Sequence, residues 1–130
     1  MRKRILLIMA ALSMALAVIS QVPTKQQFFD VCDSLSIHHP NVVWAQARLE
    51  SGNFTSAHFK NRNNCLGIYD SKNKRYASFE SWIHCLVAYR DKVQYKCKDK
   101  EINDDQYIDW LISIKYAGDP SYKQKVKKML

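Results

Sequence analysis

Residues 40–52 read PNVVWAQARLESG, and this stretch decides the class of fold that we expect. The stretch is almost fully apolar, Pro40 suits the first turn of a helix, and helices commonly end at a glycine such as Gly52. The sequence therefore predicts an apolar helix that runs from Pro40 to Glu50 or Ser51.

Further helices and one hairpin are expected on both sides of that helix. Spacings of three and four between apolar residues, with turn and capping residues between the periodic segments, indicate them. In chain order we expect a helix over 24–37 capped by Thr24, an Asn-rich loop over 53–64 with a helical turn at 56–59, a β-hairpin within 65–79, and helices opened by Ser78, Asp104 and Pro120, the middle one closed by Gly118. The predicted fold class is α+β and predominantly α, a single domain with about five helices and a short hairpin.

Length, composition and charge exclude several classes of protein. The chain has 130 residues, of which 47% are hydrophobic and 25% charged, as in one ordinary globular domain. The formal charge is +8, and 17 basic against 12 acidic residues remain once Arg2, Lys3 and Arg4 are removed, a charge of +5. Nucleic acid is not an expected partner, because the basic residues are dispersed over several helices and form no recognised motif.

The first 20 residues have the pattern of a secretory signal peptide. Basic residues are followed by an apolar run from Ile5 to Ile19 that only Ser13 interrupts. That run is short for a membrane-spanning helix, which needs about 20 apolar residues. We expect a signal peptide over 1–20, a mature N-terminus between Val18 and Val22, and a domain over 21–130. The mature protein is then secreted or periplasmic, within the cell envelope, with no stable membrane anchor.

Four cysteines follow the predicted signal: Cys32, Cys65, Cys85 and Cys97. Export would place them in an oxidising compartment, where they allow three pairings among which sequence does not choose. Free thiols buried as small apolar residues are the alternative. The spacing of a zinc knuckle and a Gly-rich phosphate loop are both missing from the sequence, so no metal or other cofactor is expected.

Glu50 is the candidate for chemistry. It stands at the C-terminal end of the apolar helix, where the helix dipole and apolar neighbours both raise the pKa of a carboxyl group. A raised pKa is what a general acid at neutral pH requires. The alternative is a glutamate that simply faces solvent at a helix end.

Four blocks of sequence resemble one family in the same order. They are AQARLESGNFTS (45–56), NNCLGI (63–68), YASFESW (76–82) and YAGDPSY (116–122). These blocks are similar to the bacterial peptidoglycan endo-β-N-acetylglucosaminidases of glycoside hydrolase family 73, also called mannosyl-glycoprotein endo-β-N-acetylglucosaminidase-like domains. The resemblance spans about residues 40–130. It departs from the family at Cys65-Leu66, where Leu-Phe is usual.

The resemblance implies a lysozyme-like fold in which Glu50 overlooks a sugar-binding groove beside the hairpin lobe. It implies hydrolysis of the β-1,4 bond between N-acetylglucosamine and N-acetylmuramic acid, with Glu50 protonating the leaving oxygen. Tyr116 matches the family's active-site tyrosine. The reaction also needs either a second carboxylate or assistance from the substrate's own acetamido group. Asp70 is the one acidic residue within the expected hairpin lobe, and it is the candidate for the second carboxylate. Glu80 is interpreted as a capping residue in the first turn of the helix opened by Ser78.

The expected substrate contacts are Asn63, Asn64, Gly67 and Tyr76, although both asparagines are equally suited to holding the loop through Asx turns. Trp44, Trp82 and Trp110 are expected in the core. The expected partner is the glycan strand of peptidoglycan, bound by a monomer. The alternatives are a wall-binding protein without turnover, and a lytic transglycosylase or muramidase that differs in its product.

Overall fold

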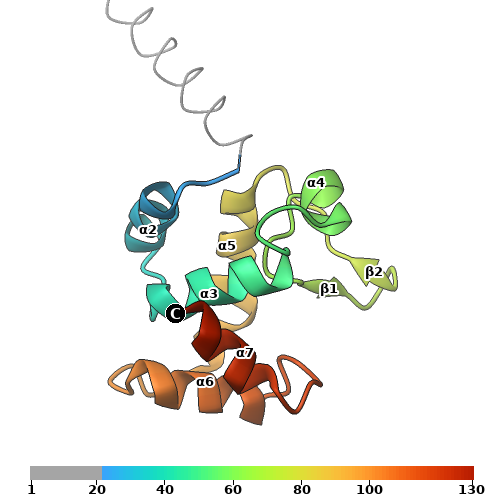
Figure 1. Cartoon of the computed structure of the whole chain (residues 1–130). Coiled ribbons are helices and arrows are strands. Elements are labelled where there is room, and N and C mark those ends of the chain that lie inside the picture. The colour runs from blue at the N-terminus through green and yellow to red at the C-terminus, as the bar shows by residue number, and fades with distance from the viewer. Residues whose placement is uncertain (1–21) are drawn as a thin grey trace, which may run out of the picture.

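The computed structural model describes residues 22–130, so the predicted signal peptide and its cleavage site lie outside the described residues. The described part holds six α-helices, one 3₁₀ turn and one two-stranded antiparallel sheet (Figure 1). The elements are α2 Lys25–Ser34, α3 Pro40–Glu50, α4 Ala57–Arg62, β1 Tyr69–Asp70, β2 Arg75–Tyr76, α5 Trp82–Lys92, η1 Gln94–Lys96, α6 Asp104–Ser113 and α7 Tyr122–Met129. The predominantly α, α+β class is confirmed and agrees with a lysozyme-like fold. Among these helices none has the length and apolarity that a membrane crossing requires.

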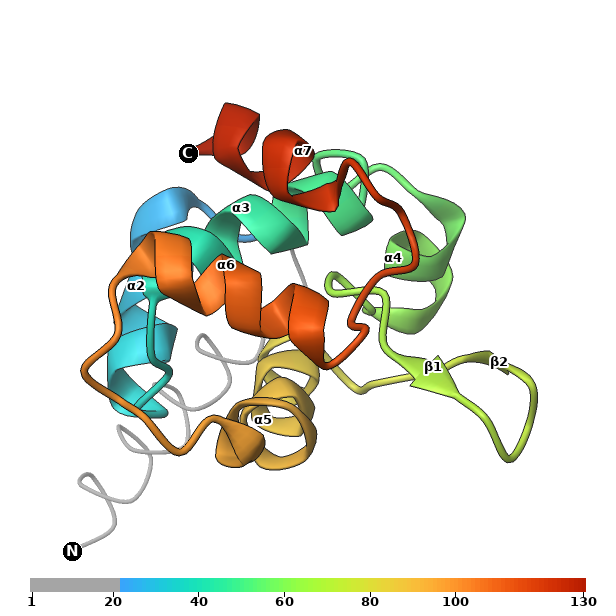
Figure 2. The same ribbon diagram turned by 90° about the horizontal axis from the view of Figure 1, so that it is seen from below.

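Helix α3 is the centre of the domain, and α2, α6 and α7 all pack against it (Figure 2). Its bounds are those predicted from Pro40 and Gly52, and Gly52 has a φ of +56° just beyond its end. Val43 and Ala47 belong to one core cluster, whereas Val42 and Ala45 belong to another. The helix is apolar on most of its surface because it separates these two clusters.

Helix α2 begins as predicted and ends earlier. Thr24 and Gln27 form a capping box, in which each side chain bonds the other residue's backbone N–H. The helix ends at Ser34 rather than Ile37, because Ser36 has a φ of +56° and turns the chain away. The predicted length was therefore wrong at the C-terminal end.

Two predicted helix starts were wrong by a few residues, since α5 begins at Trp82 and α7 begins at Tyr122 rather than at Pro120. Ser81, not Ser78, caps α5, and the Ser78 hydroxyl instead accepts a hydrogen bond from Arg62. Glu80 therefore precedes α5 and does not lie in its first turn. Helix α6 begins at Asp104 as predicted, with Asn103 as its cap, but it ends at Ser113, before Gly118.

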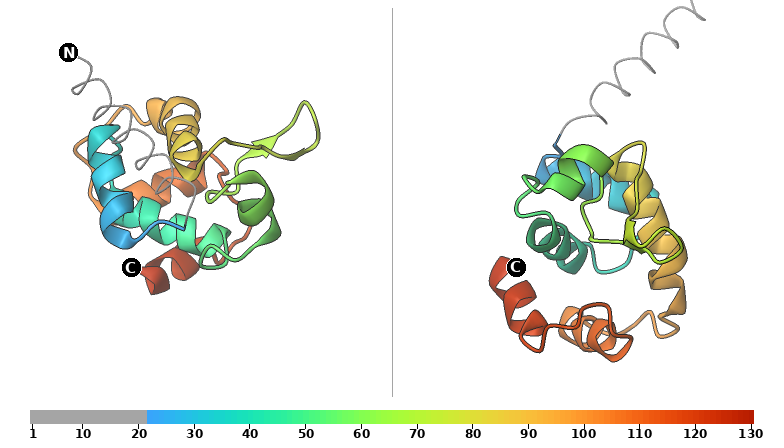
Figure 3. Two further views of the ribbon diagram at one scale, coloured as in Figure 1. Left: turned by 90° about the horizontal axis from the view of Figure 1, so that it is seen from above. Right: turned by 90° about the vertical axis from the view of Figure 1, so that its right-hand side faces the viewer.

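The hairpin is shorter than its predicted range and projects from the helical body (Figure 3). Its register pairs Tyr69 with Tyr76 and Asp70 with Arg75. The Asp70 carboxylate closes the turn, since it accepts hydrogen bonds from the backbone of Lys72 and from both the backbone and the side chain of Asn73. The projecting lobe is thus stabilised mainly by its own turn and by the loop before it.

The tryptophans and cysteines line the core. Trp82 is buried, and Trp44 and Trp110 are half-buried against the two clusters, as expected. All four cysteines are free thiols: Cys32, Cys65 and Cys85 are buried, and Cys97 is half-buried. Burial raises the pKa of the Cys32 thiol to about 12, so this thiol behaves as a small apolar side chain.

Candidate active site

Glu50 is the last residue of α3, and its half-buried side chain lines a surface pocket of about 280 Å³. The other lining residues come from the end of α3, from the segment between α6 and α7, and from α7 itself: Leu49, Ala117, Gly118, Asp119, Tyr122 and Lys125. The pocket therefore forms only when α7 and the segment before it pack on α3.

The environment of Glu50 favours its protonated form. Burial raises the pKa of this carboxyl group above its ordinary value, while a hydrogen bond from the Tyr122 side chain lowers it by a smaller amount. The direction is the one expected from sequence, and burial is its main cause. A carboxyl group that holds its proton toward neutral pH is suited to donate that proton to a leaving group.

A second carboxylate lines the same pocket and behaves in the opposite way. Hydrogen bonds from Lys125 and from Ser121 lower the pKa of Asp119 to about 2. Between about pH 2 and the raised pKa of Glu50, Asp119 is therefore ionised while Glu50 keeps its proton. Sequence reasoning missed this residue, although it lies inside the YAGDPSY block, because nothing local indicates that the block faces the end of α3.

Gly67 forms one wall beside the acid. Its φ is +65°, and a β-carbon at this position would lie 2.7 Å from Oε2 of Glu50. Tyr116 holds the adjacent peptide, since its hydroxyl donates to the Leu66 carbonyl oxygen at 2.5 Å. Burial, helped by the charges of Tyr122 and Glu50, raises the pKa of Tyr116 well above 10, so the phenol stays a donor. Gly67 therefore lies beside Glu50 and Tyr116 holds the residue before it, while the substrate-binding role of Gly67 and the catalytic role of Tyr116 stay predictions.

Asn64 is fully buried, and it bonds to the chain itself. Its Nδ2 donates to the carbonyl oxygens of Ile68 and Ala77 at 2.8 and 2.9 Å, and its Oδ1 accepts from the Ile68 N–H at 3.0 Å. Asn63 ends α4 with a φ of +52° and donates to the Phe79 carbonyl oxygen at 2.9 Å. Of the two roles left open by the sequence, these bonds match the holding of the loop.

An aromatic surface begins at the end of α3 and extends onto the hairpin. The His58 ring donates from Nε2 to the Glu50 carbonyl oxygen at 2.9 Å, and it stacks on Tyr76 with ring centres 4.4 Å apart. Tyr76 is 43% exposed and meets the edge of Tyr69, which is 59% exposed. His58 therefore connects Tyr76 to the backbone of Glu50. The sequence did not indicate this role of His58, because it arises from tertiary contacts.

Asp70 has a different setting from Asp119. Its hydrogen bonds with Asn73 lower its pKa, and it is absent from the lining of the pocket that contains Glu50. A larger pocket of about 520 Å³, lined by Arg90, Tyr95 and Lys98 among others, contains none of the predicted site residues. Within residues 22–130 no cluster of three or more His, Cys, Asp or Glu side chains is placed to hold a metal ion.

The domain is mostly helical, it has a hairpin lobe, and a half-buried carboxyl group lines a surface pocket; this combination is typical of glycoside hydrolases with a lysozyme-like fold. Comparison with known families places the chain within that class. Residues 25–130 match the glucosaminidase family, described as mannosyl-glycoprotein endo-beta-N-acetylglucosaminidase, and the chain belongs to this family. Comparisons with curated proteins and with solved structures found no match.

Proposed function

We propose that this protein is an exported hydrolase of bacterial peptidoglycan that cleaves the β-1,4 bond between N-acetylglucosamine and N-acetylmuramic acid, with Glu50 as general acid. One observation supports this above the others: the Glu50 carboxyl group lines an open pocket, lies against the backbone of Gly67, and has a raised pKa. Membership of the glucosaminidase family supports glycoside hydrolysis in general.

In the proposed reaction the Glu50 proton passes to the glycosidic oxygen as the bond from that oxygen to the anomeric carbon breaks. The anomeric carbon then gains a hydroxyl group from water, and a proton returns to Glu50. Asp119 is the ionised carboxylate in the same pocket, and we propose it as the second acidic residue in place of Asp70. The substrate's acetamido group is the alternative source of assistance, and Asp119→Asn tests the choice.

The aromatic surface of His58, Tyr69 and Tyr76 is proposed to contact sugar rings of the glycan strand. Exposed aromatic faces beside the acid bury apolar sugar surface without requiring the rings to move. The net positive charge of the mature chain favours a wall polymer that has peptide and muramic carboxylates.

The test is digestion of purified peptidoglycan by the mature protein and by Glu50→Gln, followed by borohydride reduction and mass spectrometry of the new ends. We expect reduced N-acetylglucosamine ends, and a loss of about 10²-fold or more in the variant, which keeps the shape but not the proton. Equal activity in both proteins would exclude Glu50 as the acid.

The same digestion separates the alternatives. Reduced muramic ends would identify a muramidase, and anhydro ends a lytic transglycosylase. Binding to the wall without any product would identify a non-catalytic protein. In the same assay Asp119→Asn is expected to lose more activity than Asp70→Asn, because only Asp119 shares the pocket with Glu50.

A further inference from the structure

A line of buried polar side chains crosses the core and ends at Glu50. Its members come from η1, α6, α5, α3 and α7, and all are at most 4% exposed: Gln94, Tyr107, Tyr89, Gln46 and Tyr122. Buried polar groups are costly unless they are hydrogen-bonded, so a line of five in which each side chain bonds its neighbours is a specific feature of this core.

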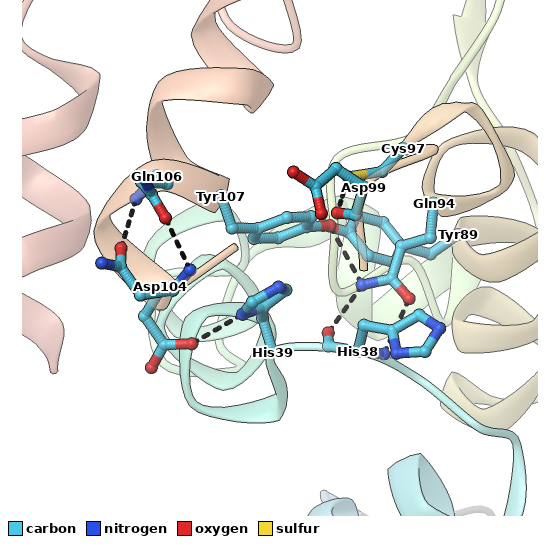
Figure 4. A network of polar contacts seen from close by, with 10 residues as sticks. His38, His39, Tyr89, Gln94, Cys97, Asp99, Asp104, Gln106 and Tyr107 are labelled. Carbon is cyan, nitrogen blue, oxygen red and sulfur yellow. Dashed lines mark hydrogen bonds and ion pairs between the residues drawn. The ribbon is translucent and has the colours of Figure 1, made fainter. Parts of the chain in front are cut away.

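The line starts at a peptide backbone that fixes its direction (Figure 4). The His38 N–H donates to Oε1 of Gln94 at 3.0 Å, and Nε2 of Gln94 donates to the His38 carbonyl oxygen at 2.7 Å. These two bonds determine which end of the amide is oxygen and which is nitrogen. The same Nε2 therefore uses its second proton toward the Tyr107 hydroxyl, at 3.0 Å.

The next bonds follow from the number of protons available. The Tyr89 hydroxyl lies 2.7 Å from that of Tyr107 and donates to Oε1 of Gln46 at 2.6 Å. An amide oxygen only accepts, so Tyr89 has spent its single proton there, and Tyr107 is the donor between the two phenols. Burial raises the pKa of both tyrosines, that of Tyr107 to about 12, so both phenols keep their protons.

The last bonds reach the acid. With its oxygen occupied by Tyr89, Gln46 donates from Nε2 to the Tyr122 hydroxyl at 2.9 Å. Tyr122 has then accepted a bond, and its own proton is left for Glu50, because both side chains line the same pocket and a hydrogen bond from Tyr122 lowers the Glu50 pKa. From Gln94 to the Glu50 carboxyl group, each bond between successive members of the line thus runs in the same sense.

We infer that Gln46 is a positioning residue for the acid: with Gln94 and the two tyrosines behind it, it obliges the Tyr122 hydroxyl to donate to Glu50. The inference rests on the proposed function, in which Glu50 is the general acid. A donated bond stabilises the carboxylate and so opposes the effect of burial on the Glu50 pKa. The line therefore adjusts the pH at which the acid loses its proton.

Other titratable groups face the acid from the elements packed around it. Asp119 and Lys125 line its pocket and pair with each other, Tyr116 lies close enough for its pKa to respond to the Glu50 charge, and His58 bonds the Glu50 carbonyl oxygen. None of these groups bonds to Gln46, so a change at Gln46 reaches Glu50 through Tyr122.

The test measures the titration of the Glu50 carboxyl group by carbon-13 NMR, together with the pH profile of kcat/KM. Gln46→Met keeps the length of the side chain and removes the donor, and Tyr122→Phe removes the proton that reaches Glu50. We expect both variants to move the titration and the alkaline limb of the profile to higher pH. The double variant is expected to move them no further than Tyr122→Phe alone, because the two residues act in one line.

A Gln46→Met protein that is folded by circular dichroism but titrates like the wild type would overturn the inference, and so would additive shifts in the double variant. If Gln46→Met does not fold, the Tyr122→Phe variant tests the inference. An unshifted Glu50 titration in that variant would show that Tyr122 does not donate to Glu50, and would overturn the inference. Gln124→Met, an exposed exchange on α7, is the matched control and should not shift. The NMR titration does not require the protein to be active. If no hydrolysis is found, that result would count against the proposed function and not against the inference about Gln46.

Discussion

The α-carbon of Gly67 lies against the carboxyl group of Glu50, so that a β-carbon at position 67 would stand 2.7 Å from Oε2 and 3.4 Å from Cδ. The residue also has a φ of +65°, a conformation that L side chains rarely adopt. The NNCLGI block therefore contains a glycine for two reasons: the turn requires it, and the acid leaves no space for a side chain.

Gly67→Ala is expected to displace the Glu50 side chain and to reduce hydrolysis by about 10-fold or more, as misplacement of a catalytic group does. It should also lower the free energy of unfolding by about 1–2 kcal/mol, because of the positive φ. Gly52→Ala is the matched control, since its φ is also positive, at +56°, but a β-carbon there meets Thr55 at 3.4 Å and not Glu50. Equal activity of the two variants would show that the contact with Glu50 does not matter.

Burial of Glu50 also predicts how stability depends on pH. The folded-state pKa lies above the ordinary value of 4.5, so folding takes up a proton between these two values. The free energy of unfolding therefore contains a contribution that is complete below pH 4.5 and is lost as pH rises through the folded-state pKa. A glutamine does not titrate, so Glu50→Gln removes this pH-dependent decrease in the free energy of unfolding. We expect the melting temperature of the variant, relative to the wild type, to increase from about pH 4 to about pH 8. A difference that stays constant with pH would contradict the raised pKa.

Asn64→Ala tests the loop-holding role of this asparagine. The substitution leaves the Ile68 N–H and the Ala77 carbonyl oxygen without their Asn64 partner, whereas the Ile68 carbonyl oxygen keeps the Ala77 N–H. Since each unsatisfied buried group costs about 1–3 kcal/mol, we expect a loss of about 3 kcal/mol in urea unfolding. The exposed Asn61 provides the control, and Asn61→Ala should stay within about 0.5 kcal/mol of the wild type. Similar losses in the two variants would argue against the role.

Tyr76→Ala tests the aromatic surface. The variant loses an exposed ring that stacks on His58, so we expect KM for peptidoglycan fragments to rise about 10-fold with kcat less affected. Tyr95→Ala is matched in exposure, because Tyr95 is 57% exposed, and Tyr95 lines a different pocket. An unchanged KM for Tyr76→Ala, or an equal rise for Tyr95→Ala, would place the sugar elsewhere.

The sequence predicted helix ends correctly where a single capping or helix-ending residue determines the position. Pro40 and Gly52 set both ends of α3, and Thr24 set the start of α2, because these residues act through their own backbone and nearest turn. The predicted start of α5 was wrong, because two serines lie close together and the sequence pattern favours Ser78 as the cap. Ser81 caps the helix, and the Ser78 hydroxyl accepts a hydrogen bond from Arg62. Arg62 lies 16 residues earlier in the chain, so no local pattern predicts this contact.

The sequence by itself determined the fold class and the position of Glu50 at the end of an apolar helix. Only the tertiary structure decided which residues meet that acid. Asp119 and Tyr122 reach Glu50 because α7 packs on α3, and Asn64 turned out to hold the hairpin because its bonds close inside the loop. Helix ends and glycine turns depend on neighbours in the chain, whereas pockets, pKa shifts and buried hydrogen-bonded lines depend on surfaces that meet only after folding.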